Sequence, residues 1–136
     1  MIRSLVWAAA CLCVANVAAA KDADPEFAVG REEYLTACAA CHGEAADGNG
    51  PIATMFKTRV PDLTGISKRN DGVFPLLEVI HTIDGRTEIK GHGNPMPTFG
   101  RRFNADAKEQ TGFYGSEFVV RGRVLELALY LQSIQE

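Results

Sequence analysis

The most regular hydrophobic pattern of the chain lies near its C-terminus. Apolar residues recur there at intervals of three or four, at Val120, Val124, Leu127, Leu131 and Ile134. This spacing places all five side chains on one face of an α-helix. Ser116 is a residue type that caps helix N-termini, so the pattern predicts a core helix that begins near it.

Two shorter helices are predicted upstream. Gly30, Tyr34 and Cys38 are four residues apart and share one face of a helix that begins next to Gly30. Apolar positions at helical spacing also mark residues 75–83, where a proline opens the segment and a glycine follows at position 85. Proline and glycine are typical of the first turn and of the C-terminal cap of a helix.

The stretches between these helices are rich in loop-forming residues. Residues 43–59 and 91–100 are rich in glycine and proline, and the polar segment 104–115 is expected to be an extended connection. No segment alternates as a β-strand would, so the fold class is predicted to be all-α. Short helices with long loops make a weak core unless a buried apolar group adds to it.

The N-terminus has the pattern of an export signal. Arg3 precedes an apolar run over residues 5–17, and three alanines at 18–20 provide a small-residue cleavage site. The run is shorter than the roughly 20 apolar residues of a membrane span, although an uncleaved N-terminal anchor is the alternative. Residues 1–20 are therefore predicted to be a signal peptide, and residues 21–136 one exported domain.

Cleavage at that site changes both the charge and the cysteine count. The 14 basic residues fall to 13 against 17 acidic ones, which gives a net charge of −4, and Cys11 and Cys13 are lost with the signal. An acidic chain of this kind is not a general nucleic-acid binder. The charge is uneven, however, because residues 57–102 carry 8 basic and 5 acidic side chains.

The two remaining cysteines belong to a five-residue motif, CAACH, at positions 38–42. C-x-x-C-H is the spacing with which two thiols, here Cys38 and Cys41, attach a haem while the adjacent His42 binds its iron. A redox-active dithiol or a zinc site has the same cysteine spacing and is the alternative. Zinc usually needs four nitrogen or sulfur ligands, and the other histidines do not complete a recognisable zinc pattern.

These motifs and their order make residues 26–136 resemble a class I c-type cytochrome. The resemblance rests on the CAACH motif, a Pro-Met-Pro triplet at 95–97, and a terminal amphipathic helix that contains Tyr130. It implies the cytochrome c fold, in which the N- and C-terminal helices cross around one covalently bound haem c. In that family a small residue and an aromatic on the first helix, here Gly30 and Tyr34, meet an aromatic on the last.

The resemblance also implies the second iron ligand. His42 is expected to bind the iron on one side and Met96, between two prolines, on the other, because a thioether is a soft, weak ligand that must be held in place. Met55 competes for this role but is expected to pack within the protein. His92 is the other alternative, and it could instead donate a hydrogen bond to a haem propionate.

Three more residues have an expected place in such a protein. Residues 48–51 resemble the family loop whose proline carbonyl accepts a hydrogen bond from the iron-binding histidine, so Pro51 is the expected acceptor. Such a bond fixes the tautomer of a ligating histidine. Phe99 stands where related bacterial cytochromes often have a tryptophan. His81 is expected to have a structural role in its helix rather than a role at the haem.

Electron transfer is the function that the resemblance implies. A monohaem carrier in the periplasm would take electrons from a donor dehydrogenase or membrane complex and pass them to an oxidase or reductase. It would not be an enzyme by itself, and without its signal it would not insert stably into a membrane. Its partners are expected to dock on some of six basic residues: Lys57, Arg59, Lys68, Arg69, Arg101 and Arg102.

Three other functions remain open at this point. The protein could be the dedicated cytochrome subunit of a periplasmic molybdenum or quinoprotein dehydrogenase, or a haem-based sensor with a displaceable sixth ligand. The least favoured is a thiol–disulfide oxidoreductase that uses Cys38 and Cys41, because such a motif needs a β-α-β context that the sequence pattern lacks.

Overall fold

The computed structural model describes residues 24–85 and 96–136, apart from the side chain of Asp106. Its helices are η1 (Pro25–Phe27), α1 (Ala28–Ala37), α2 (Ala39–His42), η2 (Ala53–Met55), α3 (Ile66–Arg69), α4 (Leu76–Asp84) and α5 (Phe99–Ser133). These described residues form no β-strand, which confirms the all-α prediction, and none of their helices is both long and apolar enough to cross a membrane. The predicted signal peptide and His92 lie outside the described residues.

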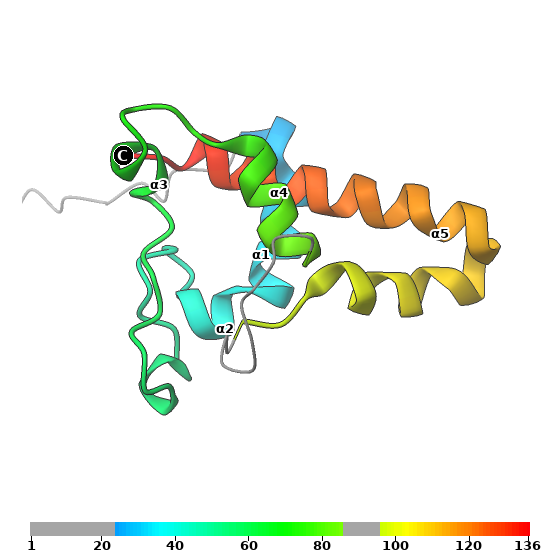
Figure 1. Cartoon of the computed structure of the whole chain (residues 1–136), viewed down its shortest axis with the longest axis horizontal. Helices are drawn as coiled ribbons and strands as arrows, with labels where there is room; N and C mark the ends of the chain where they lie inside the picture. The colour runs from blue at the N-terminus through cyan, green and yellow to red at the C-terminus, as the bar shows by residue number, and fades with distance from the viewer. Residues whose placement is uncertain (1–23, 86–95) are drawn as a thin grey trace, which may run out of the picture.

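α1 and the C-terminal half of α5 cross at close range, as the blue and the orange-to-red helices of Figure 1 show. A Cβ atom on Gly30 would overlap the backbone carbonyl of Glu126 and lie 2.8 Å from Cβ of Tyr130. Only glycine, which has no side chain, lets the two backbones come this close. The rings of Tyr34 and Tyr130 pack beside it with their centroids 5.4 Å apart, so the helix crossing predicted at these residues is confirmed.

α5 is a hairpin of two helices rather than one straight helix. Gly112 has φ 70° and ψ −176°, a conformation that glycine alone adopts readily, and the chain reverses there. Figure 1 shows the first half (yellow) beside the second half (orange), with the turn at the end farthest from the C-terminus. The prediction that residues 104–115 form an extended connection is therefore wrong, and Ser116 is a buried residue inside the helix rather than its N-cap.

The first half of α5 forms because it has a short apolar face. Phe99, Phe103 and Ala107 are four residues apart and all three are buried, so this half packs against the core along one line of the helix. The exposed positions include alanine, lysine, glutamate and glutamine at 105 and 108–110, and these residue types favour helices. The four-residue period was thus present in the sequence, although polar residues surround it.

Arg123 connects α1 with both halves of α5. Its Nε and Nη2 atoms donate to the two carboxylate oxygens of Glu33 on α1, at 2.7 and 2.9 Å. Its guanidinium carbon also lies 4.1 Å from the ring centroid of Phe103 in the first half of α5, a cation–π arrangement. The two side chains of the ion pair are only 29% and 17% exposed, so the pair is partly shielded from water and joins three helical segments.

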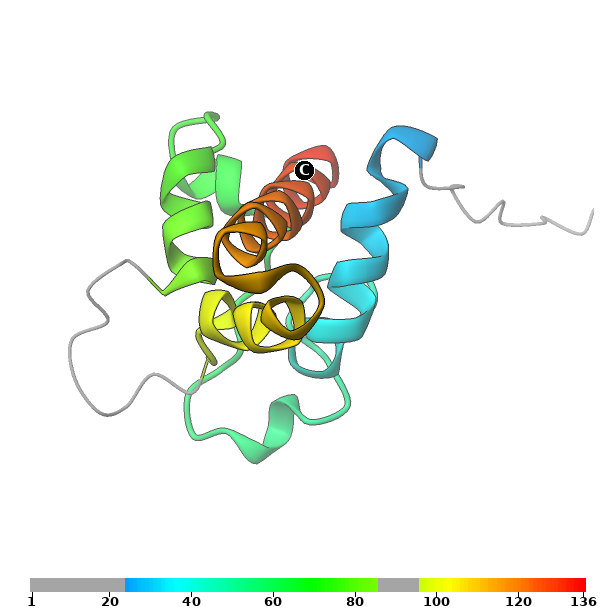
Figure 2. The same cartoon turned by 90° about the vertical axis from the view of Figure 1, so that its right-hand side faces the viewer.

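α4 packs against α5 on the side opposite to α1, and Figure 2 shows both helices beside the C-terminal half of α5. Its observed range, Leu76–Asp84, agrees with the predicted range to within one residue. Gly85 follows in the left-handed conformation, with φ 87° and ψ 20°, and closes the helix as predicted. Ile83 is the buried residue of this helix, and it directs α4 toward the centre of the molecule.

The segment between α2 and α3 has only the short helix η2, in agreement with the predicted loop. Its first part is held against α2 because the N–H of Gly48 donates to the carbonyl oxygen of His42, at 2.8 Å. Its last part returns to the same place, where the N–H of Leu63 donates to the carbonyl oxygen of Ala46, at 2.7 Å. These bonds hold residues 60–63 next to the end of α2.

Candidate functional site

A largely apolar cavity of about 380 Å³ lies between α2, the loop that returns to it, α4 and both halves of α5. Apolar side chains from the loop, α3, α4 and both halves of α5 make up much of its wall: Val60, Leu63, Ile66, Val79, Ile83, Phe99, Leu127 and Leu131. The same cavity contains four of the sequence-predicted site residues. It is therefore the place where the predicted chemistry can be tested against geometry.

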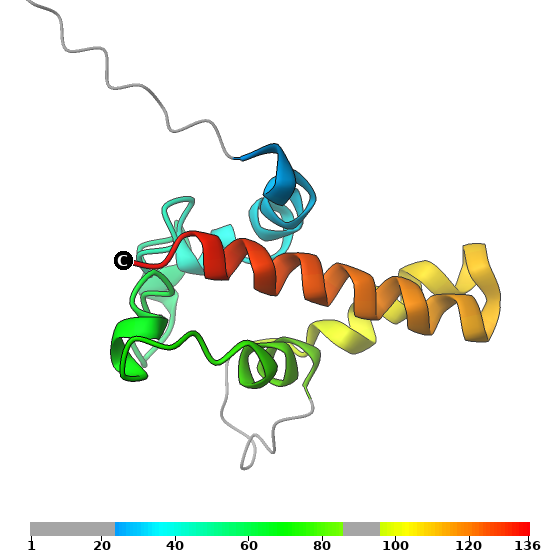
Figure 3. The same ribbon diagram turned by 90° about the horizontal axis from the view of Figure 1, so that it is seen from above.

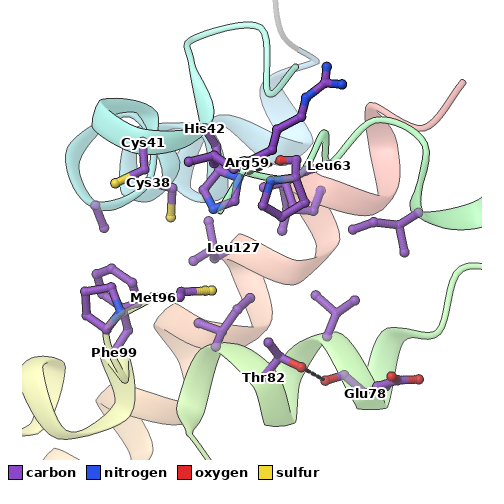
Figure 4. Close-up of a pocket in the computed structure, with 18 of the residues that line it drawn as sticks. Cys38, Cys41, His42, Arg59, Leu63, Glu78, Thr82, Met96, Phe99 and Leu127 are labelled. Atoms are coloured by element: carbon purple, nitrogen blue, oxygen red, sulfur yellow. Dashed lines mark hydrogen bonds between the residues drawn. The ribbon is translucent and has the colours of Figure 1, made fainter. Parts of the chain in front are cut away.

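Three of these side chains enter the cavity at α2. Cys38 lies at the junction between α1 and α2, while Cys41 and His42 belong to α2 itself. Figure 4 shows the two thiols close together on one wall, with the imidazole ring of His42 beside them. α2 is a single turn capped by Gly43, whose φ is 81°, so this turn and the residue just before it present all three groups to the cavity.

A hydrogen bond fixes the orientation of the His42 ring. Its Nδ1 atom lies 3.0 Å from the carbonyl oxygen of Pro61. Because a carbonyl oxygen only accepts, Nδ1 carries the proton and Nε2 keeps its lone pair. Burial lowers the pKa of His42, and the bond to Pro61 opposes this shift only in part, so the ring is neutral at pH 7. A neutral imidazole of this tautomer can bind a metal through Nε2.

The acceptor of this bond is Pro61, and the prediction of Pro51 is therefore wrong. Pro51 is exposed, and the preceding Gly50 donates its N–H to the carbonyl oxygen of Cys41, at 3.1 Å. The early part of the loop thus lies against the backbone of α2, and only the returning part reaches His42. Both prolines follow the CAACH motif within one irregular loop, so their order in the sequence could not distinguish them.

The two thiols do not resemble a catalytic dithiol. Burial raises the pKa of Cys38 to about 12, and the neighbouring Cys41 and Glu33 add to the shift. Reactive cysteines instead have a lowered pKa, since the thiolate is the nucleophile. The described residues also contain no group of three histidine, cysteine or acidic side chains that could hold a metal ion, which is the arrangement that a structural zinc site requires.

Met96 enters the cavity from the opposite side, a few residues before α5 begins at Phe99. Figure 4 shows its sulfur directed into the space that His42 and the two cysteines also face. Met55 is 79% exposed and does not line the cavity, so the expectation that it packs within the protein is wrong. His81 is half-buried on α4 and lies outside the cavity wall, as expected for a structural residue.

Two arginines line the same cavity, and the sequence pattern assigned them only to partner docking. They are Arg59 and Arg69, and the Nη2 atom of Arg69 donates to the backbone carbonyl of Asp62, at 2.6 Å. Figure 4 shows the guanidinium of Arg59 directed away from the cavity, so the arginines suit a ligand whose apolar body fills the cavity and whose carboxylate groups reach outward. These arginines and Pro61 were missed for the same reason, because their position depends on the return of the loop to α2.

The residues present fit a haem. Two thiols on one helical turn can each form a thioether bond, the Nε2 atom of His42 offers a nitrogen ligand, and the thioether of Met96 lies across the cavity. The apolar wall suits the porphyrin, and the arginines suit its propionates.

A family model described as Cytochrome c matches residues 27–112. Neither the search of curated proteins nor the search of solved structures returned a match. The matched range contains all the predicted haem residues and ends at the Gly112 turn, so the second half of α5, which crosses α1, lies beyond it. Because the match spans well over half of the 136 residues, the chain belongs to the cytochrome c family, whose members bind haem and transfer electrons.

Proposed function

We propose that the protein carries one electron at a time on a single haem c, which Cys38 and Cys41 hold covalently and His42 and Met96 ligate. The convergence of these four side chains on one apolar cavity supports this proposal. The haem supplies the one-electron chemistry, because its iron cycles between the ferrous and ferric states.

The chain's own groups position and shield this site. The carbonyl oxygen of Pro61 holds the His42 ring so that Nε2 faces the cavity, and such a bond also raises the basicity of the ligand. The apolar wall excludes water, and Arg59 and Arg69 are suited to bind the propionates. With His42 and Met96 as its ligands, a bound haem iron would have no position for a substrate, which favours an electron carrier over a sensor or an enzyme.

The predicted export signal over residues 1–20 supports a periplasmic location. Donor and acceptor proteins would meet the carrier there. The natural contact face is the side where basic residues lie near the cavity, since Arg59 and Arg69 line it and Arg101 and Arg102 follow closely after Met96.

Covalent attachment is tested by extraction with acidified acetone. Two thioether bonds should keep the haem on the polypeptide, so the wild-type protein should stain for haem after denaturing electrophoresis. Replacing both Cys38 and Cys41 with alanine should abolish the stain, whereas Met55→Ala, at an exposed position outside the cavity, should preserve it. Release of haem from the wild-type protein into the acetone would contradict the proposal.

Electron transfer to the protein's own partners is expected to slow as salt rises. Electron-transfer contacts are small and short-lived, so their rates depend on steering by charge, and a Debye length of about 8 Å at physiological salt screens that steering. The double substitution Arg101→Glu with Arg102→Glu should reduce the low-salt rate roughly tenfold. The measurement is the oxidation rate of the reduced protein by the respiratory membranes of its source.

The matched control changes the same charge elsewhere. Arg31 on α1 and Lys108 on α5 are exposed and lie outside the cavity wall, so Arg31→Glu with Lys108→Glu should have a much smaller effect. If the rate responds neither to salt nor to the change at Arg101 and Arg102, the partners dock on a different face.

A further inference from the structure

The second half of α5 has apolar residues on two faces, and the core uses only one of them. Its inward residues, such as Val124 and Leu127, are almost fully buried. On the other face Tyr114 is 82%, Phe118 78% and Leu125 41% exposed. These three residues, with Gly122 and Leu129, recur at intervals of four, four, three and four, and so lie along one line of the helix. We call this line the outer stripe.

The outer stripe faces away from the haem cavity. At 3.6 residues per turn, Gly122 and Leu131 are roughly 180° apart around the helix axis, and Leu131 lines the cavity. Figure 3 shows that the hairpin end of α5 extends beyond both α1 and α4. The described part of the chain thus leaves Tyr114 and Phe118 uncovered.

Gly122 leaves a gap in the middle of the stripe. A Cβ atom added there would have no neighbour within 4 Å, in contrast to Gly30, and its φ is not positive. Neither packing inside this chain nor the backbone conformation therefore requires a glycine, although a glycine inside a helix costs about 0.5–1 kcal/mol relative to alanine. The outer stripe thus has the bulky side chain of Phe118 and, one helical turn later, a gap at Gly122.

We propose that the outer stripe pairs two copies of this chain in an antiparallel, two-fold symmetric dimer. Phe118 of one copy packs over Gly122 of the second, and the symmetry repeats the contact in the opposite direction. The same two-fold axis places Leu125 opposite Gly115 of the second copy. In these two pairs a bulky residue meets a glycine, which is the self-complementarity that a two-fold interface needs.

The exposed apolar area suits a dimer of moderate affinity. Because an aromatic side chain buries about 150–250 Å², the exposed parts of Tyr114, Phe118 and Leu125 add up to about 400 Å² per copy. Two copies would bury about 800 Å² of apolar surface, and since interfaces are about 60% apolar, the total is about 1,300 Å². This value lies at the lower end of specific interfaces, so we expect a Kd of about 1–10 μM.

The dimer leaves both haem cavities accessible, because the cavity and the outer stripe lie on opposite faces of α5. Arg121 is exposed beside Gly122, so the two copies bring like charges near the symmetry axis. Salt screens this repulsion, and dimerisation should therefore strengthen as salt rises. Salt is expected to have the opposite effect on electron transfer to the partners, which should slow. The dimer and the proposed electron-carrier function can therefore be contradicted independently.

The test is sedimentation velocity of the holoprotein from about 1 to about 100 μM, a range that brackets the expected Kd. The wild-type mass should double across this range. Gly122→Glu should stay monomeric with an unchanged circular dichroism spectrum and an unchanged haem spectrum, because the new side chain fills the gap without touching its own fold. Phe118→Ser, which removes the bulky side of the contact, should also stay monomeric.

Met55→Ser is the matched control, because it removes another apolar side chain that is 79% exposed from η2, which packs against α2. This variant should dimerise like the wild type. A dimer that persists in both Gly122→Glu and Phe118→Ser, or one that Met55→Ser dissolves, would overturn the proposal. A wild-type chain that stays monomeric throughout would also overturn it and would point to a different protein as the occupant of the stripe.

Discussion

Replacing Met96 with alanine is expected to lower the reduction potential by on the order of 100 mV or more, since axial ligands set haem potentials over a span of about 0.8 V. Met96 is the methionine that lines the cavity among the described residues, and methionine ligation raises the potential. Alanine cannot reach the iron, so the reduced variant should also bind carbon monoxide rapidly. Redox titration, carbon monoxide binding and the weak sulfur-to-iron absorption band in the red measure the change.

The matched control is Met55→Ala, because Met55 is exposed outside the cavity wall. This variant should keep the wild-type potential, the red absorption band and the resistance to carbon monoxide. Persistence of the band in Met96→Ala would show that Met96 is not the ligand. In that case His92→Ala becomes the informative variant.

Replacing Gly30 with alanine is expected to lower the free energy of unfolding by about 3 kcal/mol, the upper end of the usual cost of overpacking. The added methyl group would overlap the carbonyl of Glu126, which is backbone and cannot rotate away. α1 and α5 would have to move apart and loosen the contact between Tyr34 and Tyr130. Urea unfolding of the holoprotein, followed by circular dichroism, measures the change.

Gly122→Ala is the control, because it is expected to raise the free energy of unfolding rather than lower it. Both glycines lie inside helices, so helix propensity alone predicts that alanine stabilises each by about 0.5–1 kcal/mol. Only Gly30 has a neighbour that opposes this gain, because the space around Gly122 is open. The comparison is made at sub-micromolar concentration, below the range in which the proposed dimer is expected to form. Equal stabilisation by both substitutions would mean that the helices do not meet closely at Gly30.

The parts of the fold that were predictable depend on residues close together in the sequence. The four-residue spacing of Gly30 and Tyr34 indicates a helix with one small and one bulky contact, and Tyr130 lies on an equally regular helix. α4 has a proline at its start and a glycine at its end. The CAACH motif occupies a single helical turn, so its three reactive side chains reach one cavity by local geometry alone.

The parts that were missed depend on contacts between distant residues. Pro61 lies next to His42 because the N–H of Leu63 donates to the carbonyl oxygen of Ala46 across the loop. No periodic pattern in the sequence predicts this return of the loop. Met55 was expected to pack because apolar residues surround it, but composition does not say which side of a loop faces the core.

The hairpin was missed because Gly112 and its polar neighbours resemble a loop. Its first half forms against the second half, where Asn104 donates to Glu117, at 3.1 Å, and Arg123 stacks on Phe103. Helix propensity alone does not indicate such a pairing, because the helix is stabilised by a partner segment that lies beyond the turn.

The contact between Asn104 and the second half of α5 makes the exposed turn at Gly112 a suitable attachment point. The side-chain amide of Asn104 also donates to the hydroxyl of Ser116, at 3.4 Å. Residues 104 and 116 therefore lie close together, and residues 105–115 form a protruding segment between them. Nothing lies within 4 Å of a side chain added at Gly112, and exposed turns of this kind tolerate insertions. The turn lies about 20 Å along α5 from Leu127 in the cavity wall, at 1.5 Å per residue. A tether attached there would fix the protein to an electrode or to a second domain at a set distance from the redox site while leaving that site open.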